Sequence, residues 1–411
     1  MESQCSVGGI TFGTGYSVFR SILPAIEQAT ESVTLVTCFW AASPTRDALN
    51  ESLLILSDKA LQRGKKARVR ICFSSSSFFQ KLFHTSSPDG KTYPPSVWHS
   101  KLGLPEHGLE GLDLEVKSIF FLPFSVWHPK FVIIDDNEVF LPSCNVSWED
   151  WFEGCVRLNG AVVEHFITFW KLHWAGSSER HPNPPLNSTS PGSSYNDTSF
   201  ENVAGKFLPS LHHRDPSFRW PWQACAPPPQ TPLNVELLRL FATADKEIRI
   251  QSPNLTCAAV LDALEDALKR GVGVKVVTSE RLMILEQLVT AGTTTSMCIK
   301  RLISKHQQML QIPWDVEAGG PRPGRLAISY YEPRAEAMRE TPEPVQSHLK
   351  LTMIDETTLV LGSGNMDRAS WFTSQELGVA FYSTELALEV SRLLSVELKG
   401  RTKLVYDSSE I

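Results

Sequence analysis

Two stretches of the chain carry the same set of reactive side chains at the same spacing. Each holds a histidine, a lysine two positions later, an aspartate, and then a serine and an asparagine. The first set is His128, Lys130, Asp135, Ser143 and Asn145, and the second, 220 positions later, is His348, Lys350, Asp355, Ser363 and Asn365. An imidazole can act as a nucleophile or as a general acid and base, and ammonium and carboxamide groups can bind an anion. The repeat indicates an internal duplication of a reactive segment.

Each stretch is predicted to form a β-hairpin. Apolar runs at 131–134 and 139–141, and at 351–354 and 358–361, flank short polar turns. A two-residue turn at 136–137 would place His128 opposite Asn145 and Lys130 opposite Ser143, with all four side chains on one face. Asp135 and Asp355 lie an odd number of positions from the histidine and lysine of their motif, so strand alternation places them on the opposite face. We therefore expect both aspartates to point away from that face and to hold the turn.

The two stretches resemble the His-x-Lys-x4-Asp motif of the phospholipase D superfamily, with its trailing Gly-Ser-x-Asn. The second stretch matches this pattern in full, including Gly362, and the first has Pro142 at the glycine position. The resemblance implies an α/β fold of two duplicated phospholipase-D-like domains. Each would be a mixed β-sheet flanked by helices, and a pseudo-twofold axis would relate them.

The resemblance also implies a reaction through a covalent intermediate. Cleavage of a phosphodiester needs an attacking group and a proton donor on opposite sides of phosphorus, and one stretch supplies only one imidazole. We expect one active site formed by both domains, with His128 as nucleophile and His348 as general acid and base. The expected contacts to the phosphate oxygens are Lys130, Lys350, Asn145 and Asn365, with further hydrogen bonds from Ser143 and Ser363. No metal and no other cofactor is expected.

A histidine nucleophile needs an acceptor for its second ring nitrogen. Glu153 and Glu376 follow the two asparagines by eight and eleven positions. The resemblance implies this role for both, with the closer match at Glu376; a solvated turn residue is the alternative for Glu153. Trp151 and Trp371 are expected to pack in the core.

The flanking segments repeat as well. Strands are predicted at 32–39 and 67–73 around a helix at 45–63, and at 248–251 and 274–277 around a helix at 257–270. Such βαβ units require parallel strands. Further strands are predicted at 114–124 and 326–331. The predicted domains are 1–176 and 233–411, joined by a Pro- and Ser-rich linker at 177–232, and the tail after Lys403 is expected to be frayed.

Composition limits the classes of partner. The 411 residues are 42% hydrophobic and 20% charged, with a net charge of −6, which argues against a general polyanion binder. No apolar run approaches the roughly 18 residues of a membrane span, and the first residues lack signal-peptide features. We expect an intracellular monomer, cytoplasmic or peripheral at a membrane. The eight scattered cysteines predict neither a zinc site nor a disulfide framework.

The predicted activity is that of a metal-independent phosphodiesterase or transphosphatidylase, acting on phospholipids. Residues 119–127 are strongly apolar and would either contact a lipid interface or form a core strand. The alternatives are a nuclease of the same superfamily, which predicts a basic groove, cardiolipin-synthase-like transfer, and a catalytically inactive scaffold that binds phosphate groups. The expected partners are a phospholipid or other phosphodiester and, peripherally, a membrane; no stable nucleic-acid partner is expected.

Overall fold

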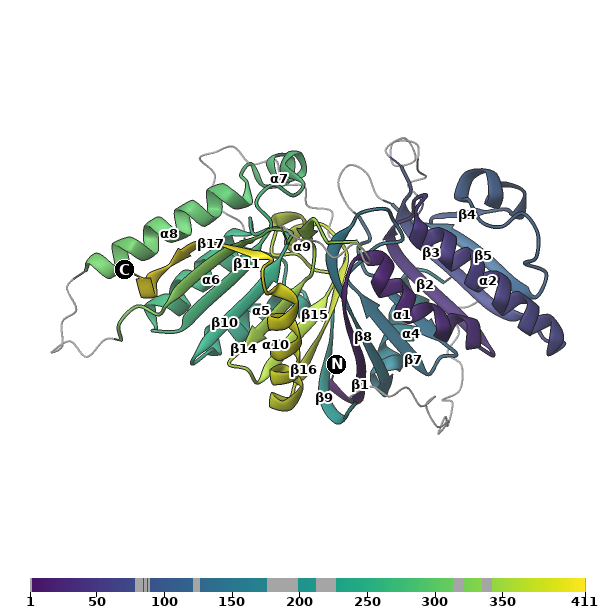
Figure 1. Cartoon of the computed structure of the whole chain (residues 1–411), viewed down its shortest axis with the longest axis horizontal. Helices are drawn as coiled ribbons and strands as arrows, with labels where there is room; N and C mark the ends of the chain where they lie inside the picture. Colours follow the sequence, from purple (N-terminus) through teal and green to yellow (C-terminus); the bar gives the residue numbers. More distant parts are fainter. Residues whose placement is uncertain are drawn as a thin grey trace. The chain divides into compact units, whose positions relative to one another are not determined.

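The computed structural model describes residues 2–77, 84, 87, 89–120, 126–175, 199–211, 227–312, 321–334 and 342–410. They form two compact units. The first comprises Met1–Leu122, Val126–Glu149 and Glu153–Phe207, and the second Pro123–Ser125, Asp150–Phe152 and Leu208–Ile411. Each unit combines a mixed β-sheet with helices (Figure 1), so the predicted α/β class is confirmed.

In the first unit the strands are β1 (Glu2–Gly13), β2 (Ser32–Phe39), β3 (Ala67–Ser75), β4 (Lys91–Tyr93), β5 (Leu112–Ser118), β6 (Phe131–Ile134), β7 (Glu138–Pro142), β8 (Trp151–Gly160) and β9 (Phe200–Ser210). Their order in the sheet is β4-β5-β3-β2-β6-β7-β8-β1-β9. The neighbours β5, β3 and β2 are parallel to one another, and every other pair is antiparallel. The βαβ prediction is therefore confirmed here.

The second unit repeats this sheet. Its strands are β10 (Glu247–Ser252), β11 (Gly273–Thr278), β12 (Leu326–Tyr331), β13 (Gln346–Ser347), β14 (Leu351–Ile354), β15 (Thr358–Gly362), β16 (Glu376–Tyr382) and β17 (Thr402–Asp407). The order β12-β11-β10-β14-β15-β16 corresponds strand for strand to β5-β3-β2-β6-β7-β8, with the same directions. The internal duplication thus extends to the topology.

Helices cover both faces of each sheet. Those of the first unit are α1 (Gly15–Gln28), α2 (Pro44–Gln62) and α4 (Val162–His173); those of the second are α5 (Pro232–Thr243), α6 (Ala258–Lys269), α7 (Ile284–Ala291), α8 (Thr295–Gln311), α9 (Arg368–Phe372) and α10 (Thr384–Leu398). Val132 and Ile134 of β6 pack in the core beneath α1 and α2, whereas Phe131 packs on Phe166 and Phe169 of α4. This explains why β6 and β14 are buried at every position.

The hairpin register differs from the prediction by one residue. Val132 pairs with Phe140 and Ile134 with Glu138, so the turn contains three residues, 135–137, instead of two. Asp135 and Asp136 adopt φ values of 50° and 53°, and Asp355 and Glu356 of the second hairpin adopt 54° and 56°. Two consecutive residues with a left-handed backbone conformation form this longer turn. The sequence does not show them, because neither turn contains the glycine that usually marks such a conformation.

The aspartates of the two turns have structural contacts, as predicted. The carboxylate of Asp135 accepts hydrogen bonds from the backbone N–H groups of Thr30, Glu31 and Ser32, at 2.7–3.1 Å. Asp355 accepts three equivalent bonds from residues 245–247, at 2.8–2.9 Å. Each aspartate therefore joins its hairpin to the start of the neighbouring strand.

Asp355→Asn is expected to lower the free energy of unfolding by about 2–3 kcal/mol, because charged acceptors form the stronger hydrogen bonds. Burial opposes ionisation of Asp355, but the backbone donors outweigh it and lower the pKa of the carboxyl. The stabilisation by the Asp355 carboxylate is therefore fully present above pH ~4, which is the pKa of the aspartate in the unfolded chain. It is lost as the pH falls through the lower pKa of Asp355 in the folded protein. Urea unfolding at several pH values measures this. Glu356→Gln is the control, since its surface pair with Arg249 should contribute less than about 1 kcal/mol.

Two predictions about connecting segments are wrong. Residues 200–210, placed in the linker, form β9 and pair with β1. The tail after Lys403 was expected to be frayed, but its residues up to 407 belong to β17 (Thr402–Asp407), which pairs with β12. Neither strand has the alternating apolar pattern that sequence reasoning uses, and β17 lies at a sheet edge. The rest of the linker at 177–198 and 212–226 lies outside the described residues.

Candidate active site

In the second unit, His348 and Lys350 form a buried pair. Both lie just before β14, and their exposed fractions are 3% and 4%. The Nζ atom of Lys350 lies 2.8 Å from Nδ1 of His348 and donates a hydrogen bond of 2.6 Å to its carbonyl oxygen. An ammonium group has only donors, so Nδ1 is the acceptor in this contact and the ring proton resides on Nε2. The pair therefore presents an N–H at the ring nitrogen that is remote from the lysine.

The first unit holds its motif in a related way. Lys130 is fully buried, and its Nζ donates a 2.9 Å hydrogen bond to the carbonyl oxygen of His128. His128 itself is half-buried. The predicted grouping of histidine with lysine is therefore present within each unit. In the second unit, the lysine also contacts Nδ1 of its histidine.

The two serines contact the two glutamates. Ser143 donates its hydroxyl to Glu153, and Ser363 donates to Glu376. Each hydroxyl also accepts the N–H of the residue after the glutamate, Gly154 at 2.9 Å and Leu377 at 3.1 Å. All four side chains are buried, with exposed fractions of 1–4%. The serines therefore orient the glutamates, and their contact with substrate stays a prediction.

Glu153 and Glu376 thus occupy equivalent positions. Glu153 lies in β8 and Glu376 begins β16, and the latter also accepts a 2.7 Å hydrogen bond from Ser370. The helix α9 lies between Asn365 and Glu376, which accounts for the longer spacing in the second half. The alternative reading of Glu153 as a solvated turn residue is wrong, because its side chain is buried and hydrogen-bonded.

The loop geometry is the same in both units despite Pro142. The N–H of Ser143 donates to the carbonyl of Gly154 at 2.8 Å, and that of Ser363 to Leu377 at 2.9 Å. At Gly362 a Cβ atom would lie 2.3 Å from the carbonyl oxygen of Leu377, so glycine is required there by close backbone approach. Pro142 ends β7, where its missing N–H is tolerated.

The two asparagines differ in their contacts. Asn145 accepts a 3.3 Å hydrogen bond from the N–H of Phe39 at Oδ1, which leaves the Nδ2 hydrogens for another acceptor. Asn365 donates from Nδ2 to Asp367 at 3.0 Å, and its buried Oδ1 has no hydrogen-bond partner within the described part of the chain. The two units therefore present different amide groups at the same motif position.

One aromatic residue near the motif was assigned wrongly from the sequence. Trp151 is only half-buried, and its ring lies 4.7 Å from that of His348, at an angle of 49°. The cause is β13, which pairs with residues 151–152 just before His348. Trp151 therefore contacts the second motif histidine. Trp371 lies in the apolar core of the second unit, as predicted.

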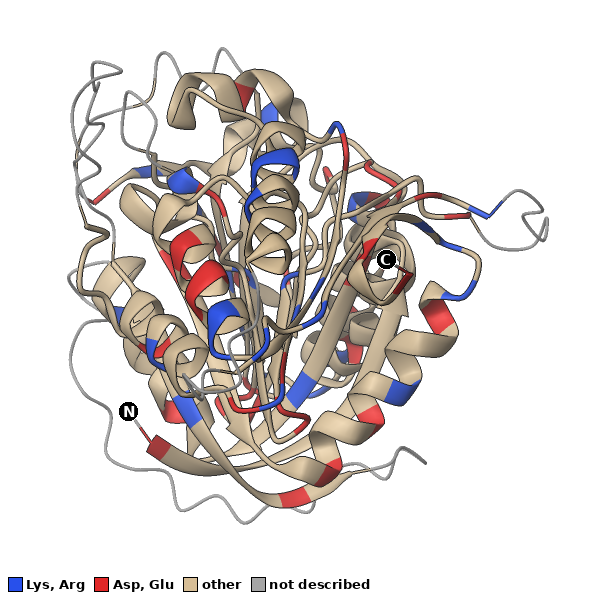
Figure 2. Cartoon of the chain, turned by 90° about the vertical axis from the view of Figure 1, so that its left-hand side faces the viewer, with Lys and Arg blue, Asp and Glu red and all other residues tan. Residues whose placement is uncertain are grey.

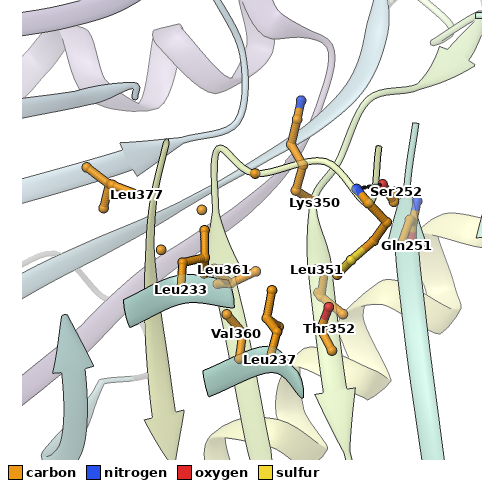
Figure 3. Close-up of a pocket in the computed structure, with 14 residues that line it drawn as sticks. Leu233, Leu237, Gln251, Ser252, Lys350, Leu351, Thr352, Val360, Leu361 and Leu377 are labelled. Carbon is orange, nitrogen blue, oxygen red and sulfur yellow. Dashed lines mark hydrogen bonds between the residues drawn. The ribbon is translucent and has the colours of Figure 1, made fainter. Parts of the chain in front are cut away.

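Figure 3 shows that Lys350 of the second motif lies apart from the apolar side chains packed next to it. Leu233, Leu237 and Val360 fill the space between α5 and the hairpin, whereas the ammonium of Lys350 points away from them at the end of β14. The cavity enclosed there is only about 20 Å³, too small for a substrate. In the described ranges, no group of three His, Cys, Asp or Glu side chains could hold a metal ion.

Comparisons with known proteins agree with this architecture. The family model described as "Cardiolipin synthase, PLD-like domain" matches residues 237–396. A phosphatidylserine synthase from Haemophilus influenzae Rd KW20 covers 96% of this chain and 87% of its own, with 14% identity and a TM-score of 0.61. A polyphosphate kinase from Porphyromonas gingivalis covers 97% and 48%, with 8% identity and a TM-score of 0.52. These two similarities concern the fold alone. No curated protein sequence matches the chain.

The matched residues include the complete second motif and its glutamate. The first unit repeats the same strand order, the same motif and the same Ser–Glu contact. The family resemblance noted in the sequence is therefore confirmed. The second half of the chain, residues 237–396, matches this phospholipase-D-like domain family.

Proposed function

We propose that the protein is a phosphodiesterase or transphosphatidylase that acts on phospholipids, with both motifs serving one reaction. The observation that carries the proposal is the duplicated arrangement itself. Each unit holds a histidine whose neighbouring lysine is buried, together with a serine-bound glutamate. Buried ammonium and carboxylate groups are unfavourable for folding unless they are paired, and such groups are concentrated at functional sites. The family match supports phosphodiester chemistry in general.

The proposed reaction has two steps. Nε2 of His128 attacks phosphorus, the bond from phosphorus to the leaving alcohol breaks, and His348 in its imidazolium form gives the Nε2 proton to that alcohol and becomes neutral. His348 then accepts a proton from water or an acceptor alcohol, whose oxygen displaces His128 from phosphorus. Lys130, Lys350, Asn145 and Asn365 would stabilise the charge on the phosphate oxygens.

The choice of a phospholipid has separate support. The chain has a net charge of −6, and Lys and Arg are interspersed with Asp and Glu on the helices that face the viewer in Figure 2. A phosphatidylserine synthase has a similar fold. The stretch 119–127 is not an exposed contact surface where it is described, because Ile119, Phe120 and Trp127 are buried; residues 121–125 lie outside the described residues.

The surface that best fits a lipid interface is on α7. Leu285, Val289 and Met297 have exposed fractions of 80%, 56% and 58%, and Met283, Ile284 and Leu288 are also exposed. Arg368 at the start of α9 donates a 3.3 Å hydrogen bond to the carbonyl of Thr290, so α7 is attached close to the second motif. Exposed Lys300 and Arg301 follow Met297 by one helical turn, as suits an anionic surface. No helix in the described ranges is long and apolar enough to span a bilayer.

Replacing Leu285 and Val289 together by aspartate is expected to weaken binding to anionic vesicles by about tenfold or more, because two apolar side chains no longer enter the interface. Cosedimentation with vesicles measures this. Leu388→Asp with Val396→Asp is the matched control, since these α10 residues are 47% and 57% exposed. Equal loss in both variants would contradict a specific role for α7.

The proposed function is tested by release of head group and of phosphatidic acid from mixed phospholipid vesicles. Turnover by the parent protein, absent in His348→Ala, is the expected result. If the parent leaves every phospholipid intact but cleaves single-stranded DNA or RNA, the substrate assignment is wrong and the protein is a nuclease. No turnover and no covalent adduct with any diester would indicate a phosphate-binding scaffold.

A further inference from the structure

The first unit has a second polar cavity at the same sheet edge as His128. It has a volume of about 290 Å³ and is lined by Ser76, Ser77, His84, Lys91, Tyr93, Lys101 and Leu102. Six of these seven side chains are polar, and none of the described residues that line it is acidic. We propose that this cavity binds a phosphomonoester group on the head group of the substrate. This inference rests on the proposed function for its substrate, and it adds a residue-level basis for specificity.

The cavity has positive charge that no ion pair with a described residue neutralises. Lys91 and Lys101 are exposed at its rim, and neither forms an ion pair with a described residue. Lys91 lies over the ring of Tyr93, 5.2 Å from its centre, which orients the ammonium. Two ammonium groups without a carboxylate favour an anion with two charges and disfavour a cationic head group such as choline.

The floor of the cavity is fixed by a buried hydroxyl. Ser118, at the end of β5, is fully buried, and its Oγ lies 2.8 Å from Nε2 of His84 and 3.1 Å from the hydroxyl of Tyr93. Tyr93 is itself 5% exposed and packs on Phe73. A chain of three polar side chains held by the core is preorganised, so a ligand does not have to order it.

The strand that leads into the cavity is hydrogen-bonded to the residue before His128. Strands β3 and β5 end at the edge where β6 begins, because β6 is antiparallel to its neighbour β2 and β2 is parallel to β3. Ser74 of β3 accepts a 3.1 Å hydrogen bond from the N–H of Trp127 and donates one of 3.0 Å to the carbonyl of Ile119. His128 directly follows Trp127, whose N–H is hydrogen-bonded to β3, and β3 leads into Ser76 and Ser77. A head group whose diester is attacked by His128 can therefore place a second phosphate in the cavity.

Binding is tested first, without catalysis. In a His348→Ala background, inorganic phosphate and glycerol 3-phosphate are titrated by calorimetry into protein with native lysines and into the Lys91→Gln/Lys101→Gln variant. We expect affinity to fall at least tenfold in the lysine variant, because two charge-assisted contacts are lost. Lys66→Gln/Lys399→Gln makes the same charge change at exposed positions elsewhere and should bind as the background does. Equal affinity in all three proteins would overturn the proposal.

Specificity is tested second, with phosphatidylinositol and phosphatidylinositol 4-phosphate, whose head groups differ only by one phosphomonoester. We expect the parent to prefer the phosphorylated lipid at least tenfold in kcat/KM, and the Lys91→Gln/Lys101→Gln variant to lose the preference while retaining turnover of phosphatidylinositol. Binding of free phosphate without this preference would overturn the head-group assignment. If neither lipid is cleaved but the cavity binds glycerol 3-phosphate through the two lysines, the proposed function fails and the phosphate site stands.

Discussion

His128→Ala is expected to abolish both turnover and formation of a covalent adduct, whereas His348→Ala loses turnover but keeps adduct formation with an activated diester. A nitrophenolate leaves without protonation, so the first step no longer needs an acid when the substrate is a nitrophenyl diester. The second step still needs a base to activate water, so the phosphohistidine accumulates. For an alkyl diester, the absence of His348 should cost about 10²–10⁴-fold in rate.

A burst of nitrophenol in His348→Ala, equal to one per protein, measures the accumulated adduct. Mass spectrometry of a digest under neutral conditions would then locate the phosphoryl group on His128. His107→Ala, which removes an exposed histidine of the first unit, is the control and should leave both steps unchanged. A burst in His128→Ala and none in His348→Ala would show that the two histidines have exchanged roles.

The structure supplies an asymmetry between the histidines that the sequence lacks. In the sequence the two motifs carry the same His, Lys, Asp, Ser and Asn, so the nucleophile could be assigned only by family resemblance. The structure shows Lys350 at Nδ1 of His348 and Trp151 against the same ring. Neither contact is visible in the spacing of the motif. The first depends on a lysine rotamer, and the second on pairing between β8 and β13, which are distant in sequence.

Most of the sheet could be predicted because apolar runs and duplication reinforce each other. Residues 32–39, 131–134, 326–331 and 351–354 are strands with the predicted bounds, and helices α2 and α6 begin and end within one residue of prediction. Strands β9 and β17 were missed because neither has a continuous apolar run or a regular alternation of apolar and polar residues. The hairpin register was wrong because side-chain polarity does not reveal two left-handed residues in a row.

The glutamates illustrate the remaining limit. Ser143 and Ser363 were identified as site residues from their spacing, but their role depends on which group lies opposite them. β8 and β16 return beside β7 and β15 and bring Glu153 and Glu376 against the serines. Sequence distance alone, eight residues in one half and eleven in the other, concealed this equivalence. The repeated Ser–Glu pair was detectable only from the sheet.

Lys350→Met is expected to reduce kcat by about 10²–10³-fold while leaving the protein equally stable or more stable. Loss of one preorganised donor at a developing oxyanion has an effect of that size. A buried ammonium is costly to desolvate, and a methionine of similar length fills the same space beside Leu351 and Gln251.

The two readouts together separate catalysis from folding. Activity is measured with alkyl and nitrophenyl diesters, and stability by thermal unfolding of the same preparations. Lys59→Met, which removes a surface lysine bonded to the carbonyl of Glu27, is the control and should change neither by much. If Lys350→Met unfolds at a much lower temperature and its remaining folded fraction is fully active, Lys350 is a structural residue and the site is misassigned. A stable, inactive variant would show that this charge is kept in the interior because the reaction needs it.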